Sequence, residues 1–358
     1  MRKIKIGVIG TGTMGNCHAD QFAKYPDFQL TALCDIDEAA LKRTAEKHSI
    51  TQTYTDYRKF LANADVEAVV VPLPNYLHAP VSIAALEAGK HVFCEKPMTV
   101  SVKDAKAMVA AAVKARKKGL AMQIGVVWRQ DGRAMTIKKL IDSGKLGEIY
   151  HVRATLIRRR GIPGLGGWFT TAAKSGGGAV MDIGVHWIDL AMYVASLWNA
   201  TAVSAANYAK FGPLMKGYHF GGMWAGPPRY DGTFDVEDYT TGLVRFGKSA
   251  TMNFNIAWAV NGPDAGFIEF NGTKGGAVFM PWGDKVTLYT EQKKQVANVE
   301  LPLASTEEFF ARQGRLFAAA CRGKGNVPAT PEQGLDVVRV LTAINRSAKA
   351  GKEVKVQR

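Results

Sequence analysis

A glycine-rich turn near the amino end of the chain has the spacing of a phosphate-binding loop. Its residues are Gly10, Thr11, Gly12, Thr13, Met14 and Gly15, a GxGxxG pattern that follows an apolar, strand-like run and opens a helical pattern. Glycines here allow a tight turn and let backbone amides and the helix dipole approach a pyrophosphate. A turn without a ligand is the simpler alternative, but the strand before and the helix after favour a dinucleotide site.

A carboxylate follows the next apolar run. Asp35 lies about 20 residues beyond the last glycine, where an acidic residue accepts hydrogen bonds from an adenosine ribose. Asp35 would also repel a 2′-phosphate, and Asp37 adds to this repulsion, while Lys42 and Arg43 partly offset it. The sequence therefore predicts NAD as cofactor, with NADP less favoured.

A lysine stands at the end of another strand-like run. Lys96 follows the apolar residues 91 to 94, between Glu95 and Pro97. A lysine is most often a solvated surface charge, but ligands of open α/β sheets bind at the carboxyl ends of the strands. We therefore expect Lys96 to have a functional role.

Asp182 and His186 are four residues apart, which places them on one face of a helix. Asp189 and Tyr193 extend a polar stripe that could simply be a solvated face. Three glycines at 176–178 instead suggest a close approach to a ligand, and histidine titrates near neutral pH, so it is a natural proton carrier. Both interpretations stay open at this point.

The first third of the chain has the pattern of a parallel sheet. Short Val/Ile-rich runs at 4–10, 30–35, 68–72, 91–95 and 121–126 alternate with helical patterns at 15–24, 38–48, 79–88 and 101–118. Strands buried on both faces and separated by helices are typical of a doubly wound α/β fold. We predict a Rossmann domain over residues 1–126.

The remainder, residues 127–358, reads as an α+β domain. One helix at 133–142 precedes strand-like runs at 151–157, 203–210, 239–246, 250–258, 266–271 and 285–291, and helical patterns at 305–322 and 331–350 close the chain. This succession predicts a large, open-faced, mainly antiparallel sheet, with the last helices able to pack back on the first domain. An exposed sheet face usually needs a partner surface, so we expect a homodimer or homotetramer.

Composition excludes several classes of protein. The chain has 358 residues and a formal net charge of +15, but its basic residues are scattered, so we expect no nucleic-acid or membrane partner. Its four cysteines form no CxxC pair and no HExxH motif is present, which predicts reduced thiols and no metal site. The amino end runs into a strand pattern without an apolar leader, so we expect a cytoplasmic protein.

Four separated motifs together resemble those of a known family. They are the Gly10 to Gly15 turn, the run Pro74-Asn75-Tyr76-Leu77-His78, the tripeptide Glu95-Lys96-Pro97, and Gly177-Gly178 followed by Asp182 and His186. In this order they resemble the glucose-fructose oxidoreductase, inositol dehydrogenase and rhizopine-catabolism family (Gfo/Idh/MocA). The resemblance covers essentially the whole chain. It implies a Rossmann domain, an open-faced sheet domain, a nicotinamide cofactor, and usually a sugar or polyol substrate.

The resemblance also implies roles for individual residues. Lys96 would be the catalytic lysine that orients the substrate hydroxyl, His186 the general acid or base, and Asp182 a ligand of a substrate hydroxyl. The expected cofactor contacts are Gly10, Thr11, Gly12, Thr13, Met14, Gly15, Asp35, Ile36, Pro72, Leu73, Asn75, His78, Glu95, Lys96, Trp128 and Arg129. The expected substrate contacts are Lys96, Arg158, Trp168, Asp182 and His186. From sequence alone, Asn75 and His78 read as a turn or helix cap, and His18 as a packed helix residue.

Three functions fit these residues. The first is an NAD-dependent dehydrogenase or reductase acting on a ring hydroxyl or ketone of a sugar or cyclic polyol. The second is a redox-neutral lyase or glycoside-cleaving enzyme that retains its NAD and passes through a transient keto-sugar. The third is a non-enzymatic dinucleotide sensor, although a sensor has no need of a proton carrier such as His186.

A long segment at 211–238, rich in glycine and aromatic residues, interrupts the strands of the second domain. Segments of this length without regular structure are usually functional or disordered, and the aromatic content disfavours disorder. We predict that Trp224 closes the substrate pocket; a subunit-contact loop is the alternative. In that case Arg158 and Arg160, on one side of their strand, would be the better substrate contacts.

Overall fold

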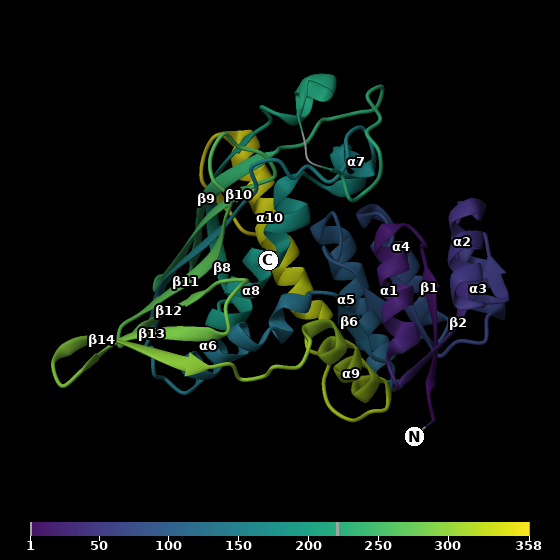
Figure 1. Ribbon diagram of the computed structural model, residues 1–358, viewed down its shortest axis with the longest axis horizontal. Helices are drawn as coiled ribbons and strands as arrows, with labels where there is room; N and C mark the ends of the chain where they lie inside the picture. Colours follow the sequence, from purple (N-terminus) through teal and green to yellow (C-terminus); the bar gives the residue numbers. More distant parts are fainter. Residues whose placement is uncertain (1, 220–221, 358) are drawn as a thin grey trace. The chain divides into compact units, whose positions relative to one another are not determined.

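The computed structural model describes residues 2–219 and 222–357. The chain divides into two compact units (Figure 1). The first unit comprises Met1–Val126 and Phe310–Val338, and the second comprises Val127–Phe309 and Arg339–Arg358. Helix α10 (Pro331–Ala350) contributes its first residues to the first unit and the rest to the second.

The first unit contains a six-stranded parallel sheet with the order β3-β2-β1-β4-β5-β6. Its strands are β1 (Ile4–Ile9), β2 (Phe28–Cys34), β3 (Gln52–Tyr54), β4 (Ala68–Val71), β5 (His91–Cys94) and β6 (Met122–Ile124). This confirms the predicted doubly wound sheet. The sequence pattern did not predict β3. Its three residues are not fully buried, so it lacks the apolar run that marks the other strands.

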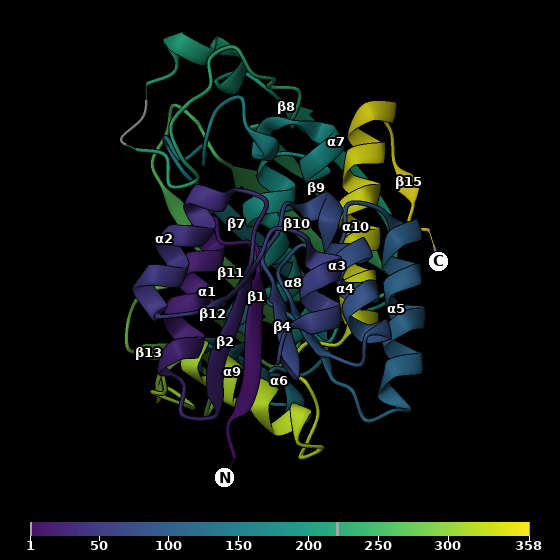
Figure 2. The same ribbon diagram turned by 90° about the vertical axis from the view of Figure 1, so that its right-hand side faces the viewer.

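Helices cover both faces of this sheet (Figure 2). On one face lie α1 (Thr13–Lys24), α2 (Glu38–His48) and α9 (Phe309–Cys321), and on the other α3 (Tyr57–Asn63), α4 (His78–Glu87) and α5 (Val102–Arg116). Phe317 of α9 stacks on Phe28 and meets Phe93 edge to face, so α9 completes the core on its side. Leu335 and Val338 of α10 join the core on the other side.

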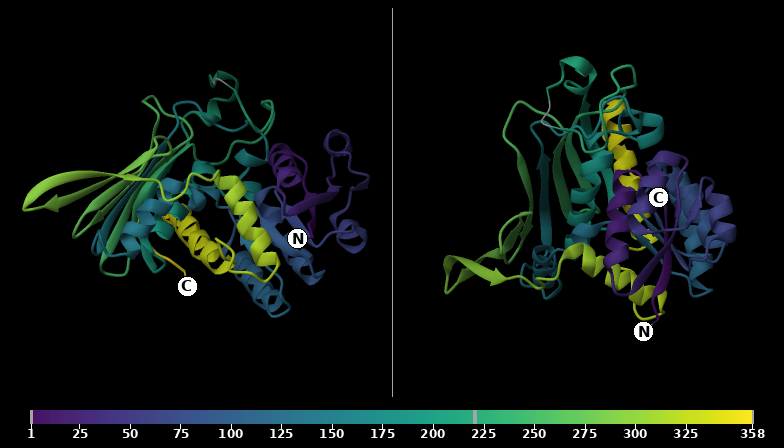
Figure 3. Two further views of the ribbon diagram at one scale, coloured as in Figure 1. Left: turned by 60° about the horizontal axis from the view of Figure 1, so that its bottom comes forward. Right: turned by 45° about the vertical axis from the view of Figure 1, so that its right-hand side comes forward.

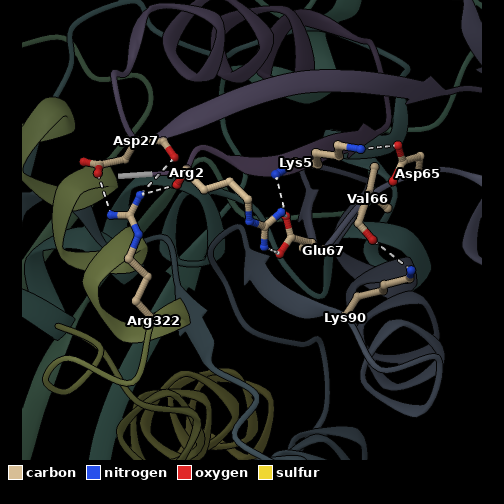
Figure 4. A network of polar contacts seen from close by, with 8 residues as sticks. All are labelled: Arg2, Lys5, Asp27, Asp65, Val66, Glu67, Lys90 and Arg322. Atoms are coloured by element: carbon tan, nitrogen blue, oxygen red, sulfur yellow. Dashed lines mark hydrogen bonds and ion pairs between the residues drawn. The ribbon is translucent and has the colours of Figure 1, made fainter.

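Charged contacts fasten α9 to the amino ends of the strands (Figure 4). Arg322 donates to the Asp27 carboxylate at 2.6 Å and to the Arg2 carbonyl at 3.2 Å. Beside it, Arg2 pairs with Glu67, which also accepts from the Lys5 amide at 3.1 Å. This network lies at the edge opposite the carboxyl ends, where ligands of such sheets bind, so we assign it to stability.

The second unit contains a nine-stranded sheet with the order β14-β13-β12-β11-β7-β10-β9-β8-β15. Its strands are β7 (Ile149–Ile157), β8 (Ala200–Tyr208), β9 (Tyr239–Phe246), β10 (Ala250–Ala257), β11 (Ala265–Gly272), β12 (Gly276–Phe279), β13 (Lys285–Gln292), β14 (Gln295–Pro302) and β15 (Val354–Lys355). The β7–β10 pair is parallel, whereas the other registered pairs are antiparallel. The predicted mainly antiparallel sheet is therefore confirmed.

One face of this sheet is covered and the other is open. Val152, Phe254 and Phe270 are buried on the covered face, where α8 (Val185–Ala195) packs. On the opposite face the central strands carry Arg153 and Asn253, both exposed. The β13–β14 hairpin forms the end of the sheet opposite β15 (Figure 3).

Within the described ranges, no helix combines the length and the apolar character needed to cross a membrane. Across the same residues, no three or more His, Cys, Asp or Glu side chains gather in an arrangement that could hold a metal ion.

Candidate active site

The glycine-rich turn at residues 10–15 is as tight as its glycines predicted. Gly10 has a φ of +108°, and a Cβ there would lie 2.9 Å from the Leu73 side chain. A Cβ on Gly15 would lie 1.8 Å from the Gly10 carbonyl oxygen, so α1 packs against the turn only with glycine present. A Cβ on Gly12 would meet nothing within 4 Å. The turn thus has room for a ligand on its Gly12 side.

The amino end of α1 suits a pyrophosphate. Gly12 is the N-cap residue and supplies no side-chain hydrogen bond to the first turn. The side-chain amide of Asn16, within α1, donates to the carbonyl of Thr11 at 2.6 Å and so leaves the amides of the first turn without a side-chain cap. Phosphates bind at helix ends of this kind through backbone amides and the helix dipole. These residues fit a dinucleotide.

Asp35, just beyond β2, ties the turn to the neighbouring strand. Its Oδ2 accepts from the amide of Thr11 and from the Thr11 hydroxyl at 3.0 Å, and its Oδ1 accepts from the Asp37 amide at 2.9 Å. Ile36 is 89% exposed. The carboxylate therefore has a structural role besides the ribose contact that we predict for it.

Two histidines hold the segment that carries Lys96. His18 of α1 is buried, and its Nε2 lies 2.7 Å from Oε1 of Glu95. The other oxygen of Glu95 accepts from the Lys96 amide at 3.0 Å. On the far side, Nδ1 of His78 lies 2.7 Å from the Pro97 carbonyl and its Nε2 lies 2.7 Å from the Leu73 carbonyl. The backbone around Lys96 is thus fixed by groups from α1 and α4.

The pKa values of these buried groups follow from their surroundings. Burial alone would raise the pKa of Glu95, but the hydrogen bond from His18 and the charges of His18 and Lys96 outweigh it, so the pKa lies below its ordinary value. Burial lowers the pKa of His78, against the opposing effect of its two carbonyl contacts. Glu95 is therefore a buried carboxylate that favours its charged form.

The turn predicted at Asn75 is present, but neither Asn75 nor His78 is the N-cap residue of α4. The N-cap residue of α4 is Leu77, with no side-chain cap, and the His78 ring points instead to the carbonyls of Leu73 and Pro97. Asn75 is buried in the short helical turn that precedes α4. Their expected contacts with the cofactor stay predictions.

Asp182 and His186 lie at the start of the α8 helix. A π-helical turn, Val180–Gly184, carries Asp182 and leads into α8, which carries His186. Asp182 is only 5% exposed and Asp189 is also buried, so the interpretation of this stripe as a solvated face is wrong. His186 is half-buried. Turns of the π type recur at functional sites.

Glu237 caps this turn from a distant part of the chain. Its carboxylate is buried and accepts from the amides of Gly178 and Val180 at 2.9 Å. Glycine is required at 178, because a Cβ there would lie 1.8 Å from the Glu237 carbonyl oxygen. Burial raises the pKa of Glu237, although these amide hydrogen bonds oppose the shift. The carboxylate thus sets where the Asp182 turn begins.

The indole of Trp258 is hydrogen-bonded to Asp182: its Nε1 donates to Oδ2 of Asp182 at 3.0 Å. Trp258 follows β10 and is fully buried. Its backbone amide donates to the carbonyl of Asp238 at 2.8 Å. Asp182, the residue predicted to bind a substrate hydroxyl, is therefore hydrogen-bonded to a side chain whose backbone is itself held in place.

Arg129 and Trp128, two of the predicted cofactor contacts, have partners within the second unit. Arg129 is 1% exposed and forms a bidentate ion pair with Asp189 at 2.6 and 2.8 Å. The Arg129 guanidinium also lies over the Tyr193 ring. Trp128 stacks on Phe309 within an aromatic cluster. We assign both residues to packing of the second unit, and their contacts with the cofactor stay predictions.

The aromatic residues around Trp168 form a cluster with the 211–238 segment. Trp168 stacks on Phe169 with ring centroids 3.7 Å apart, and Trp224 meets Phe169 edge to face at 5.2 Å. The segment also donates from Ala225 to the carbonyl of Pro163. Residues 220 and 221 of this segment lie outside the described residues.

The start of the same segment is held by Asp238 and Arg160. Oδ2 of Asp238 accepts from the amides of Lys210, Phe211 and Gly212 at 2.6–2.9 Å. Arg160 lies over the Phe211 ring and donates to the Val260 carbonyl at 2.7 Å, while Arg158 is half-buried. Arg160 therefore fastens the segment to its neighbours.

Sequence reasoning missed Glu237, Asp238 and Trp258. The partners of their side-chain hydrogen bonds lie 26 to 76 residues away along the chain, so no local spacing points to them. The one local signal is the acidic pair Glu237-Asp238 directly before a strand, a place where carboxylates accept from nearby amides.

Two family models match the chain. Residues 4–124 match a model described as "Oxidoreductase family, NAD-binding Rossmann fold", and residues 134–278 match one described as "GFO/IDH/MocA C-terminal domain". The first unit therefore contains an NAD-binding Rossmann domain.

Individual proteins are similar over the full length. D-glucoside 3-dehydrogenase of Escherichia coli (strain K12) is 28% identical over 356 residues, which cover 99% of this chain and 97% of that protein. The crystal structure of an oxidoreductase domain protein from Kribbella flavida has a TM-score of 0.86 and 28% identity, with both chains fully covered. A levoglucosan dehydrogenase solved with NADH and levoglucosan shares the fold, with a TM-score of 0.85, 23% identity and full coverage of both chains.

Proposed function

The chain belongs to the GFO/IDH/MocA family of NAD-binding oxidoreductases, and on this premise we propose that it transfers a hydride between the nicotinamide cofactor and a ring hydroxyl or ketone of a sugar or cyclic polyol. The named relatives that act on a glucoside and on levoglucosan support the substrate class. The family membership supports the reaction type.

The observation that carries the proposal is the fixed position of Lys96. Lys96 follows β5, and its backbone is held through Glu95 by His18, a residue of the helix that the phosphate turn opens. Since β1, β4 and β5 are neighbours in one parallel sheet, the turn after β1 and Lys96 after β5 share its carboxyl edge. Ligands of open parallel sheets bind at this edge.

Each residue has a distinct part in the proposed chemistry. When bound, NAD supplies the acceptor for the hydride from the carbinol carbon. Lys96 places a positive charge beside the substrate oxygen and stabilises the negative charge that develops there. His186 takes the hydroxyl proton as general base, and Asp182 accepts a hydrogen bond from a substrate hydroxyl and so orients the ring.

A substrate panel tests this function. The protein with NAD is incubated with aldoses, methyl glucosides, anhydrosugars and inositols, while absorbance of NADH and the sugar products are followed. Net NADH together with an equal amount of keto-sugar supports the proposal. Products without net NADH indicate the redox-neutral lyase, and binding of NAD with no product from any sugar indicates the sensor.

A further inference from the structure

The backbone of Trp258 is hydrogen-bonded through both its amide and its carbonyl. The residue is 0% exposed and directly follows β10. Its amide donates to the Asp238 carbonyl at 2.8 Å, and its carbonyl accepts from the Gly161 amide at 2.7 Å. The backbone that carries the indole ring is therefore held by segments from both sides.

The indole donates to a carboxylate that is itself buried. Nε1 of Trp258 lies 3.0 Å from Oδ2 of Asp182, and Asp182 is 5% exposed. A carboxylate removed from water must recover hydrogen bonds from protein donors. A hydrogen bond to a charged acceptor is stronger than one between neutral groups. The contact thus fixes one oxygen of Asp182.

The backbone of Asp182 is fixed independently. Its turn is capped by Glu237 through the amides of Gly178 and Val180. Gly184, at the end of the turn, lies against β10, since a Cβ there would be 3.3 Å from Ile256. With the backbone held in this way, the rotation of the Asp182 side chain is what remains to be set.

We propose that Trp258 is a positioning residue that orients the Asp182 carboxylate toward the substrate hydroxyl. The inference rests on the proposed function, in which Asp182 binds that hydroxyl. Trp258 touches no reacting atom and acts through Asp182. A carboxylate misplaced by about 1 Å can cost an enzyme roughly 10²-fold in rate.

The chain offers a matched control in Trp187. This tryptophan is also buried in the second unit, but its Nε1 donates to the neutral carbonyl of Phe267 at 3.2 Å. Trp187→Phe and Trp258→Phe therefore remove the same atoms, each from a buried site. Only Trp258→Phe removes a donor to Asp182.

A double-mutant cycle tests the proposal in the holoenzyme. Trp258→Phe is expected to lower kcat/KM for the sugar by about 10- to 10²-fold without changing the Kd for NADH. If Trp258 acts through Asp182, the double variant Trp258→Phe/Asp182→Asn has the kcat/KM of Asp182→Asn alone, within about threefold. For the control, the double variant Trp187→Phe/Asp182→Asn is expected to show independent effects: its loss in kcat/KM is the product of the small loss in Trp187→Phe and the loss in Asp182→Asn. Full multiplication of the Trp258→Phe and Asp182→Asn effects would overturn the proposal.

A spectroscopic arm needs no turnover and separates the two proposals. The chain has seven tryptophans, and loss of one indole N–H signal in Trp258→Phe identifies that of Trp258. Asp182→Asn is expected to shift the Trp258 signal more than any other indole signal. An unmoved Trp258 signal would overturn the positioning role, whereas a protein that oxidises no sugar but shows the shift contradicts the proposed function alone.

Discussion

Asp35 has a structural role, and we predict that it also contacts the cofactor. Its Oδ2 accepts from the amide and the hydroxyl of Thr11, so it holds the phosphate turn in place. The predicted ribose contact would use acceptor capacity that the carboxylate retains, since its two oxygens offer about four lone-pair sites. Removal of the charge is therefore expected to affect both the turn and the choice of cofactor.

The double substitution Asp35→Ser/Ile36→Arg is expected to shift the ratio of kcat/KM values for NADP and NAD toward NADP by about 10-fold or more. It removes a charged acceptor worth roughly 1.5–3 kcal/mol and adds a cation for the 2′-phosphate. The exposed side chain of Ile36 leaves room for arginine. Steady-state kinetics with both cofactors measure the ratio, with Ile36→Arg alone as the control that keeps the carboxylate. An unchanged ratio would show that Asp35 does not contact the ribose.

Glu95 makes the free energy of unfolding depend on pH. Burial alone would raise its pKa, but His18 and Lys96 outweigh that effect and bring the pKa below the ordinary 4.5, so folding favours the charged form. The stabilisation is thus complete above pH 4.5 and is lost as the pH falls through the folded pKa. We expect the wild type to be more stable than Glu95→Gln by about 1–3 kcal/mol at pH 6, with the difference shrinking below pH 4.5. Urea unfolding at a series of pH values measures this difference, and a constant difference would contradict the assignment.

Among the helices and strands, the sequence predicted those that carry the candidate site, but it did not predict the π-helical turn with which the Asp182 helix begins. The spacing of Asp182 and His186 predicted a helix, whereas the π-helical turn depends on Glu237, 55 residues beyond Asp182. The strand at 295–302 was missed because its residues alternate between exposed and half-buried at the end of the sheet and include no buried run. Such elements are set by long-range contacts that no local pattern contains.

The 211–238 segment is the element for which the sequence left two roles open. Its contact with Phe169, the stacking partner of Trp168, favours the substrate side, because Trp168 is a predicted substrate contact. Trp224→Ala is expected to raise KM for the sugar by roughly 10-fold, the loss of about 1.5 kcal/mol of aromatic contact, without a change in the Kd for NAD. Tyr230→Ala, an exposed aromatic of the same segment, is the control. A normal KM with an altered oligomeric mass would instead place the segment at a subunit interface.

For the whole molecule, the order of strands and helices predicted a parallel sheet followed by a mainly antiparallel one, and both are present. The grouping of residues 310–338 with the first unit depends on side chains such as Phe317 and Leu335 that enter its two cores. An amphipathic pattern shows that a helix has an apolar face but not which core that face joins. The sequence therefore predicted α9 and α10 as helices, but not which of the two units each would join.

The open face of the nine-stranded sheet leads to a prediction on assembly. Leu243 alternates with the buried Val244 and lies beside the exposed Asn253 across the β9–β10 register, so it faces the open side. We expect a homodimer or homotetramer of the 38.8 kDa chain that buries this face. Leu243→Glu is expected to lower the mass measured by analytical ultracentrifugation, whereas Val296→Glu on the exposed β14 is a control for added charge. A wild-type monomer at micromolar concentration would contradict the assembly.

In the proposed function, hydride passes directly between a sugar carbon and the nicotinamide. The most direct measurement incubates the holoenzyme with NAD and a panel of sugars deuterated at their ring carbons, then determines deuterium in the recovered cofactor by mass spectrometry. We expect reduced cofactor that carries one deuterium, with its rate of formation lowered roughly 10²- to 10⁴-fold in Lys96→Ala and His186→Ala at unchanged affinity for NAD. Cofactor recovered without deuterium from every sugar, while NAD binds normally, would contradict it.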